Sequence, residues 1–157
     1  MIAYAPPLLF VLAWLFAIVG WDPPIADGSV AFDESALRWM LFLGMGWSIL
    51  GGAITHTIFA RSTAKAIGWE TNGFQYEVGY ASLGIGLAGV YASGVESSSA
   101  WIAAALAGGI FLLLAGVNHV VEIVRDKNYA PGNTAILLSD IGVPASLLVL
   151  LISVGAI

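Results

Sequence analysis

Residues 100–124 read AWIAAALAGGIFLLLAGVNHVVEIV, and this stretch decides the class of fold. It is longer than the roughly 20 apolar residues that a helix needs to cross the hydrocarbon core of a membrane. The rest of the chain has the same character, because 59% of its 157 residues are hydrophobic and only 10% are charged. A soluble domain is about 25% charged. This composition cannot supply a water-facing surface, and so we expect an integral membrane protein.

Four more stretches come close to this length. Together they predict an all-α integral membrane helical bundle with five transmembrane helices, a four-helix core plus an N-terminal helix. The predicted helices cover residues 4–21, 35–60, 74–94, 100–124 and 133–157. The connections between them are short, and so we expect residues 1–157 to form a single transmembrane domain.

The positions of the basic residues predict the orientation, because Lys and Arg are retained on the cytoplasmic side of a membrane. Four of the five lie after the second and fourth predicted helices, at Arg61, Lys65, Arg125 and Lys127. The acidic residues of the opposite side are Asp22, Asp27, Asp33, Glu34 and Glu96, with Arg38 as the single basic exception. The pattern predicts a multi-pass protein of the cell inner (plasma) membrane with its N-terminus inside and its C-terminus outside.

The absence of cysteine narrows the chemistry. A chain with no cysteine has no disulfide, thiolate metal ligand, iron–sulfur cluster or cysteine nucleophile. Its net charge of −5 argues against nucleic acid, which is bound by basic surfaces. The lipid bilayer is the expected surrounding.

Ionisable side chains inside the predicted helices are the best candidates for a functional site, because such groups are costly in hydrocarbon. Three carboxylates and both histidines of the protein lie there, at His56, Glu77, His119, Glu122 and Asp140. Counted from the basic loops, all five lie about 5–10 Å inside the cytoplasmic boundary at about 1.5 Å per helical residue. His119 and Glu122 are three residues apart and therefore share one helix face. We expect these groups, from four different helices, to converge.

Stripes of small residues support this convergence, because small residues allow membrane helices to approach closely. The face that leads to Glu77 carries Ala81, Gly84 and Ala88, and the face that leads to His119 carries Gly108, Leu112, Ala115 and Gly116. Pro144 removes the helical hydrogen bond to the carbonyl of Asp140, four residues earlier. We therefore expect a kink in the fifth helix beside this carboxyl group.

Two imidazoles and three carboxylates in a region of low dielectric constant predict a bound cation. Nitrogen and oxygen ligands of this kind suit iron, zinc or manganese. We expect one transition metal ion, or an incomplete pair, held by His56, Glu77, His119, Glu122 and Asp140. Haem b between the two histidines is a variant of this hypothesis. Asp140, as a proton relay, and Tyr80, as a hydrogen-bonding or redox partner, are the candidate catalytic residues.

The second to fifth predicted helices also resemble a known family. The glycine-punctuated stretch 37–52, Glu77 with the following Gly79 and the glycine run at 84–89, and a fourth helix that ends in His119 are similar to the small four-helix DoxX-like membrane proteins. The chain is also similar to uncharacterised small integral membrane proteins of bacteria and archaea. The resemblance implies a four-helix bundle with an extra leading helix and an association with quinone-linked redox chemistry. It extends to Glu77 and His119.

Three functions stay open at this stage. The first is a membrane protein with a buried metal site, redox-active and linked to a quinone. The second is a transporter or channel for a cation or proton that uses the same residues. The third is a structural or accessory subunit whose buried polar groups fix the packing of the helices. The expected ligand is a quinone or a small cation, and a second copy of the chain is a possible partner.

Overall fold

The computed structural model describes residues 4–23 and 30–157, and within these residues every regular element is helical. In chain order the elements are α1 (Ala5–Ile18), α2 (Phe32–Trp39), η2 (Met40–Trp47), α3 (Ser48–Thr57), α4 (Ala60–Ile67), α5 (Gly73–Ser93), α6 (Ser98–Asp126), α7 (Pro131–Thr134) and α8 (Leu137–Ser153). The predicted all-α class is confirmed. Asp27, one of the acids expected on the outer side, lies outside the described residues.

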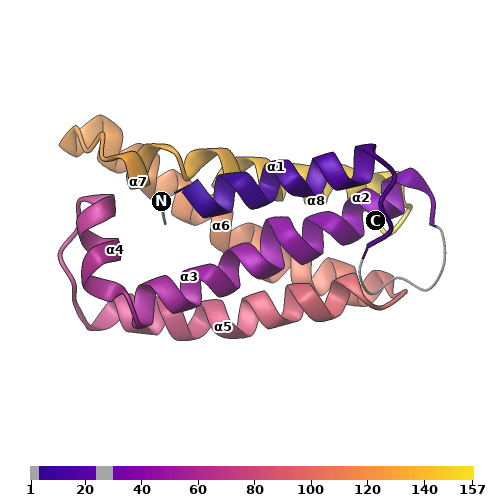
Figure 1. Ribbon diagram of the computed structural model, residues 1–157, viewed down its shortest axis with the longest axis horizontal. Coiled ribbons are helices and arrows are strands. Elements are labelled where there is room, and N and C mark those ends of the chain that lie inside the picture. The colour runs from indigo at the N-terminus through magenta and orange to yellow at the C-terminus, as the bar shows by residue number, and fades with distance from the viewer. Residues whose placement is uncertain (1–3, 24–29) are drawn as a thin grey trace.

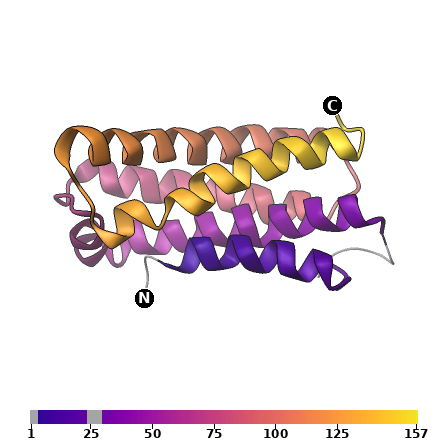
Figure 2. The same ribbon diagram turned by 90° about the horizontal axis from the view of Figure 1, so that it is seen from above.

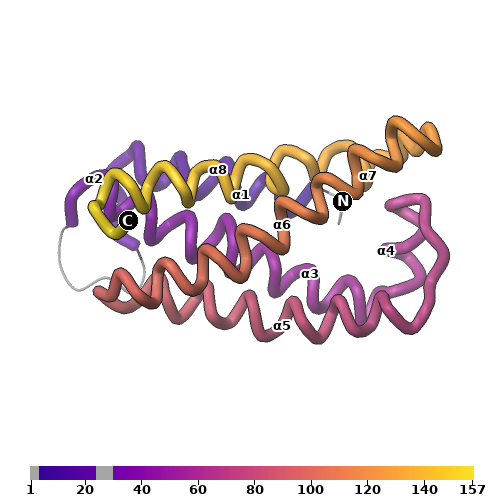
Figure 3. Tube along the Cα trace, turned by 180° about the vertical axis from the view of Figure 1, so that it is seen from behind, coloured from indigo at the N-terminus to yellow at the C-terminus, as the bar shows by residue number. Residues whose placement is uncertain are grey.

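The long helices run side by side along one axis (Figure 1). The continuous helix formed by α2, η2 and α3 packs against α5 and against α1, and α6 packs against α8 and α5. In Figure 2, α8 crosses obliquely between α6 and α1, and it contacts both. The N-terminus, α4 and α7 lie at one end of the bundle, and the C-terminus and the start of α2 lie at the other (Figures 1 and 3). These are called the α4/α7 end and the α2 end below.

Three helices are long and apolar enough to cross a membrane. They cover Phe32–Thr57 (26 residues), Ser98–Asp126 (29 residues) and Pro131–Ser153 (23 residues). Among the other helices, α1 is apolar but has 14 residues, and α5 has 21 residues with the polar Gln75 and Glu77 near its start. The outward surface is apolar, since Leu114 is 61% and Leu148 is 56% exposed. These features are those of a protein that spans a membrane.

The second predicted helix ends earlier than expected, and a helix occupies part of the loop predicted after it. The chain breaks after α3 and continues as α4. One face of α4 is buried at Ala60, Thr63 and Ala64, while Arg61 and Lys65 on the other face are exposed. The sequence predicts no helix between residues 60 and 74, because a helix of 8 residues is too short for its apolar period to stand out.

The face of α5 that packs inward differs from the predicted one. Its buried residues include Gln75, Gly79, Ser82, Gly86 and Gly89, whereas Ala81, Gly84 and Ala88 are exposed. A Cβ atom added to Gly86 would lie 2.9 Å from the carbonyl oxygen of Gly46, and one added to Gly84 would meet nothing within 4 Å. Both faces are rich in small residues, so composition alone did not distinguish them. The expectation that the Glu77 face packs inward was wrong.

The π-helix η2 lies at a close contact with α5. A Cβ atom added to Gly46 would lie 2.9 Å from Val90 Cγ2, and one added to Gly89 would lie 3.1 Å from Gly46 Cα. The wider π-helical turn therefore sits where two backbones touch. It ends at Trp47, where the lining of the cavity described below begins.

A fully paired arginine joins three helices at the α2 end. Arg38 is 4% exposed. Its Nη2 lies 2.7 Å from Glu34 Oε1, and its Nη1 donates a hydrogen bond of 3.0 Å to the carbonyl oxygen of Ser93. Its guanidinium carbon lies 5.4 Å from the ring centroid of Trp101. These contacts account for the single basic residue found apart from the others, because its charge is compensated inside the bundle.

Candidate functional site

A cavity of about 1000 Å³ lies among α1, α3, α4, α6 and the start of α8. Most of its lining residues are apolar, and three ionisable side chains, His56, His119 and Asp140, are also part of its wall. Ile54 and Leu114 line the cavity as well and are 49% and 61% exposed. The cavity therefore reaches the apolar outer surface of the bundle.

His119 on α6 and Asp140 on α8 form a buried ionisable pair in the wall of this cavity. They are 7% and 3% exposed, and His119 Nε2 lies 3.7 Å from Asp140 Oδ2. The two helices come this close because Gly116 faces Asp140, where an added Cβ atom would lie 3.0 Å from the Asp140 Cβ. The small-residue face that the sequence predicts on the fourth helix is thus confirmed at Gly108, Leu112 and Gly116, which are buried.

Asn133 on α7 fixes the orientation of the His119 ring. Asn133 is fully buried, and its Oδ1 lies 2.6 Å from His119 Nδ1. The Asn133 Nδ2 donates a hydrogen bond of 2.8 Å to the carbonyl oxygen of Asn128, which sets the direction of the amide. Because an amide oxygen only accepts, the His119 Nδ1 carries a hydrogen, and Nε2 is the atom directed at Asp140. No pattern in the sequence indicated this contact.

Asp140 keeps an unused polar atom. Its Oδ2 is buried and has no hydrogen-bond partner, a property shared among the described residues only by Gln75 Oε1. Pro144 lies within α8, as the sequence indicates, and so the carbonyl of Asp140 receives no helical hydrogen bond from that position. Buried polar atoms are nearly always paired in native proteins, which makes Asp140 an exception that calls for an explanation.

His56 lies on the same cavity wall, at the end of α3, and is half-buried. Its Nδ1 is 3.4 Å from Gln75 Nε2, and this amide also donates a hydrogen bond of 2.8 Å to the carbonyl oxygen of Ala60. Gln75 thereby links α5 to the break between α3 and α4. The sequence offered no signal for Gln75 beyond its place at the start of a helix.

Glu122 stabilises the rim of the cavity rather than its interior. Its Oε2 accepts hydrogen bonds from Trp69 Nε1 at 2.5 Å and from Asn128 Nδ2 at 2.9 Å. The indole of Trp69 stacks on His119, with ring centroids 5.8 Å apart. Gly68 permits this turn with φ +88°, and a side chain there would collide with Asn128. The segment after α4 therefore covers His119.

The other candidate residues lie apart from the cavity. Glu77 is exposed on α5, and Tyr80 is 65% exposed on the same helix. Neither belongs to the cavity wall. Within the part of the chain that the structure describes, no group of three or more His, Asp or Glu side chains is placed to hold a metal ion. The five predicted ligands are thus not gathered into one cluster.

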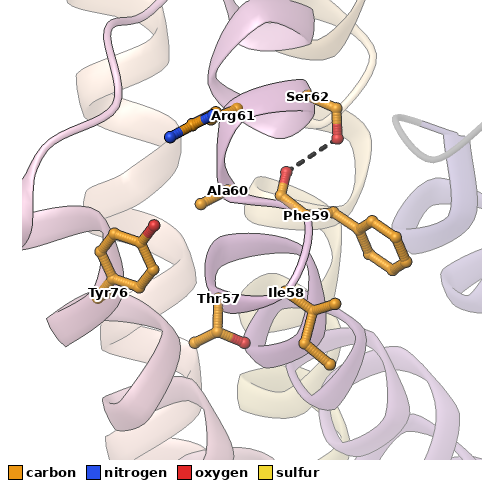
Figure 4. A pocket seen from close by; sticks show the side chains of 7 residues that line it. All are labelled: Thr57, Ile58, Phe59, Ala60, Arg61, Ser62 and Tyr76. Atoms are coloured by element: carbon orange, nitrogen blue, oxygen red, sulfur yellow. Dashed lines mark hydrogen bonds between the residues drawn. The ribbon is translucent and has the colours of Figure 1, made fainter.

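A second hollow of about 420 Å³ lies at the break between α3 and α4. Figure 4 shows Thr57, Arg61 and Tyr76 around it, and the hydrogen bond of 2.9 Å from Ser62 Oγ to the carbonyl oxygen of Phe59. Arg61, the one ionisable side chain besides Tyr76 on its wall, is exposed. The buried His119–Asp140 pair makes the larger cavity the stronger candidate.

The chain belongs to the family described as "Family of unknown function (DUF6790)", which it matches over residues 3–155. No curated protein and no solved structure matches the chain. Its function therefore has to be argued from the site.

Proposed function

We propose that this chain is a membrane protein that binds an amphiphilic small molecule in the large cavity. The polar head group lies at His119 and Asp140, and the apolar body lies along the rest of the lining. The observation that carries the proposal is Asp140 Oδ2, a buried carboxylate oxygen without a hydrogen-bond partner in a residue of the cavity wall. Leaving such an atom unpaired costs about 1–3 kcal/mol, which a polar group of a ligand would recover.

The size and lining of the cavity suit such a ligand. Pockets for small molecules are lined mainly by apolar side chains with a few polar groups that orient the ligand. About 1000 Å³ is enough for a ring and part of a hydrocarbon tail. The cavity also reaches the outer surface beside Ile54 and Leu114, which are exposed and apolar. A molecule dissolved in lipid has a direct route to it.

A quinone is the ligand class that we favour. Its ring carries polar oxygen atoms and its tail is apolar, which matches the distribution of polar and apolar side chains in the cavity. The resemblance to DoxX-like proteins implies quinone-linked redox chemistry, and His119 is one of the two residues to which that resemblance extends. Asp140 would hold or release a proton beside the ring. Tyr80 has no part in this proposal, because it lies outside the cavity.

We place the protein in the inner membrane with five crossings. Besides the three long apolar spans, α1 and α5 lie within the same bundle and run along the same axis (Figure 1). The basic residues Arg61, Lys65 and Lys127 gather at the α4/α7 end and are exposed, which supports a cytoplasmic location for that end. The candidate site would then lie in the cytoplasmic half of the membrane.

A metal ion in the same cavity is the second candidate. It is supported by the His119–Asp140 pair in the cavity wall, which offers a nitrogen and an oxygen ligand of the kind that iron, zinc or manganese accept. His56 lines the same cavity but forms no three-residue ligand group with this pair. Such an ion would complete its coordination with the bound molecule or with water, because Glu77 is exposed away from the cavity and Glu122 is hydrogen-bonded to Trp69 and Asn128. Haem b between the two histidines belongs to the same class. Metal analysis and an absorption spectrum of the purified protein test both.

Quinone binding is the decisive experiment. Purified protein in lipid nanodiscs is titrated with decylbenzoquinone by calorimetry, with empty nanodiscs as the blank. We expect saturable binding, weakened roughly tenfold in Asp140→Leu, since the hydrogen bond that the protonated Asp140 carboxyl group donates to a quinone oxygen is lost. Glu77→Gln is the matched control, because Glu77 is exposed and away from the cavity, and its affinity should equal that of the wild type.

Two results would overturn the proposal. If wild-type protein shows no saturable binding of the quinone, the proposal fails and the transporter hypothesis remains. That hypothesis predicts proton or cation flux dependent on Asp140 in sealed vesicles. If wild type and Asp140→Leu bind the quinone equally, the proposed role of Asp140 fails and the structural-subunit hypothesis remains. In that hypothesis the polar pair only fixes helix packing.

A further inference from the structure

The hydrogen-bonding state of His119 restricts what the site can bind. Its Nδ1 hydrogen is committed to Asn133 Oδ1 at 2.6 Å. The atom left for a ligand is Nε2, which accepts a hydrogen bond in the neutral ring and donates one only when the ring is protonated. Asn133 therefore determines which nitrogen of His119 faces the cavity.

His119 and Asp140 together form a pair that is electrically neutral when they share one proton. The proton lies either on Nε2 or on the carboxyl group, and in both cases the pair offers one donor and one acceptor. An uncompensated charge would be costly in such a buried site, which favours the neutral state. The separation of 3.7 Å between Nε2 and Oδ2 is too long for these two atoms to hydrogen-bond with each other.

We infer that the cavity binds a head group with a hydroxyl, as in a phenol or the hydroquinone form of the proposed ligand, more tightly than one with carbonyl or ether oxygens alone, such as the oxidised quinone. This inference rests on the proposed function, because it names the ligand class of the same cavity. A hydroxyl is the smallest group that is at once a donor and an acceptor. It accepts from the protonated member of the pair and donates to the other member.

The distance between the two protein atoms fits this arrangement. A hydroxyl oxygen about 2.8 Å from each partner is within ordinary hydrogen-bond range, and two atoms 3.7 Å apart can both be reached from one such position. A carbonyl or ether oxygen can only accept, so it satisfies the donor and leaves the acceptor buried and unpaired. An ammonium group can only donate, and it would add a positive charge to a pair that is already neutral.

A matched set of probes tests the inference. 4-Nonylphenol, its methyl ether 4-nonylanisole and the amine 4-nonylbenzylamine share one apolar chain and differ in the head group. Each is titrated into nanodiscs that contain the full-length protein, and binding is corrected for uptake by empty nanodiscs. We expect the phenol to bind about tenfold more tightly than the ether, since the ether leaves one buried acceptor unpaired. The amine should bind no better than the ether.

Two variants connect this preference to the pair. Asp140→Asn keeps one donor and one acceptor beside His119, and so the phenol should keep its advantage. The double variant His119→Phe with Asp140→Leu removes both groups but keeps an aromatic ring against Trp69, and the phenol and the ether should then bind equally. Loss of the preference in Asp140→Asn, or its survival in the double variant, would overturn the inference.

The failure of the inference can be told apart from that of the proposed function. If no probe and no quinone bind beyond the uptake by empty nanodiscs, the proposed function fails and the inference with it. If the phenol and the ether bind wild-type protein equally, or the amine binds best, the cavity is a ligand site but the hydroxyl preference is wrong.

Discussion

Each end of the bundle holds a deeply buried charged-type side chain, and the two differ in how completely their hydrogen bonds are satisfied. Arg38 at the α2 end and Asp140 toward the α4/α7 end are 4% and 3% exposed. Arg38 is bound by a carboxylate, a backbone carbonyl and an aromatic ring from three helices. Asp140 has a histidine at 3.7 Å and an oxygen with no partner. Burial alone therefore does not separate a structural charge from a functional one, whereas the completeness of its hydrogen bonding does.

The largest change in stability is expected at the α2 end, for Arg38. Arg38→Ala removes the partner of Glu34 and of the Ser93 carbonyl, and should lower the free energy of unfolding by about 3 kcal/mol, as the loss of one member of a buried ion pair does. Thermal unfolding in detergent measures the change. Arg125→Ala is the control, because the Arg125 side chain is 71% exposed and pairs with Asp126 at the surface. Equal destabilisation by both variants would contradict the contrast between the two ends.

A change of the opposite sign in the free energy of unfolding is expected toward the α4/α7 end, for Asp140. Asp140→Leu removes a buried polar atom that has no partner, and should raise the free energy of unfolding by about 1 kcal/mol or leave it unchanged. Ser139→Ala is the neighbouring control, since the Ser139 Oγ bonds only to the carbonyl of Ile136 within its own helix. Clear destabilisation by Asp140→Leu, beyond that of Ser139→Ala, would make Asp140 a structural residue like Arg38.

The smallest change in stability is expected at the rim of the cavity, for Trp69. Trp69→Phe keeps an aromatic ring against His119 but loses the hydrogen bond to Glu122. The free energy of unfolding should fall by about 0.5 kcal/mol, because the bond is at the surface. Quinone affinity, measured by the titration described above, should stay within about twofold of the wild type by the same reasoning. A large loss of affinity would show that the indole nitrogen takes part in binding.

The sequence predicted well those features that depend on hydropathy and on spacing along one helix. The apolar run at 100–124 became α6, and the face with Gly108, Gly116 and His119 packs inward. Pro144 and Asp140 share α8 as expected. These features are local, since a period of 3.6 residues and a missing N–H group act within a single helix.

Features that depend on which helices meet could not be predicted in the same way. Two faces of α5 were rich in small residues, and only the contact of Gly86 with Gly46 decided between them. Glu77 therefore remained outside. The contact between Asn133 and His119 joins a short helix to a long one, and no periodicity within either segment encodes it. Arg38 stood out in the sequence only as the single basic exception on the acidic side, because its partner on α5 is distant in the sequence.

The cavity opens on the apolar flank beside Ile54 and Leu114, and this limits which parts of a ligand the protein can select for. A ligand that comes from the bilayer has its tail in hydrocarbon before and after it binds, and transfer between two such surroundings yields almost no hydrophobic free energy. Lengthening the tail would therefore enrich the ligand in the membrane without sharpening its recognition. Discrimination among lipid-soluble compounds is left to a few atoms of the head group.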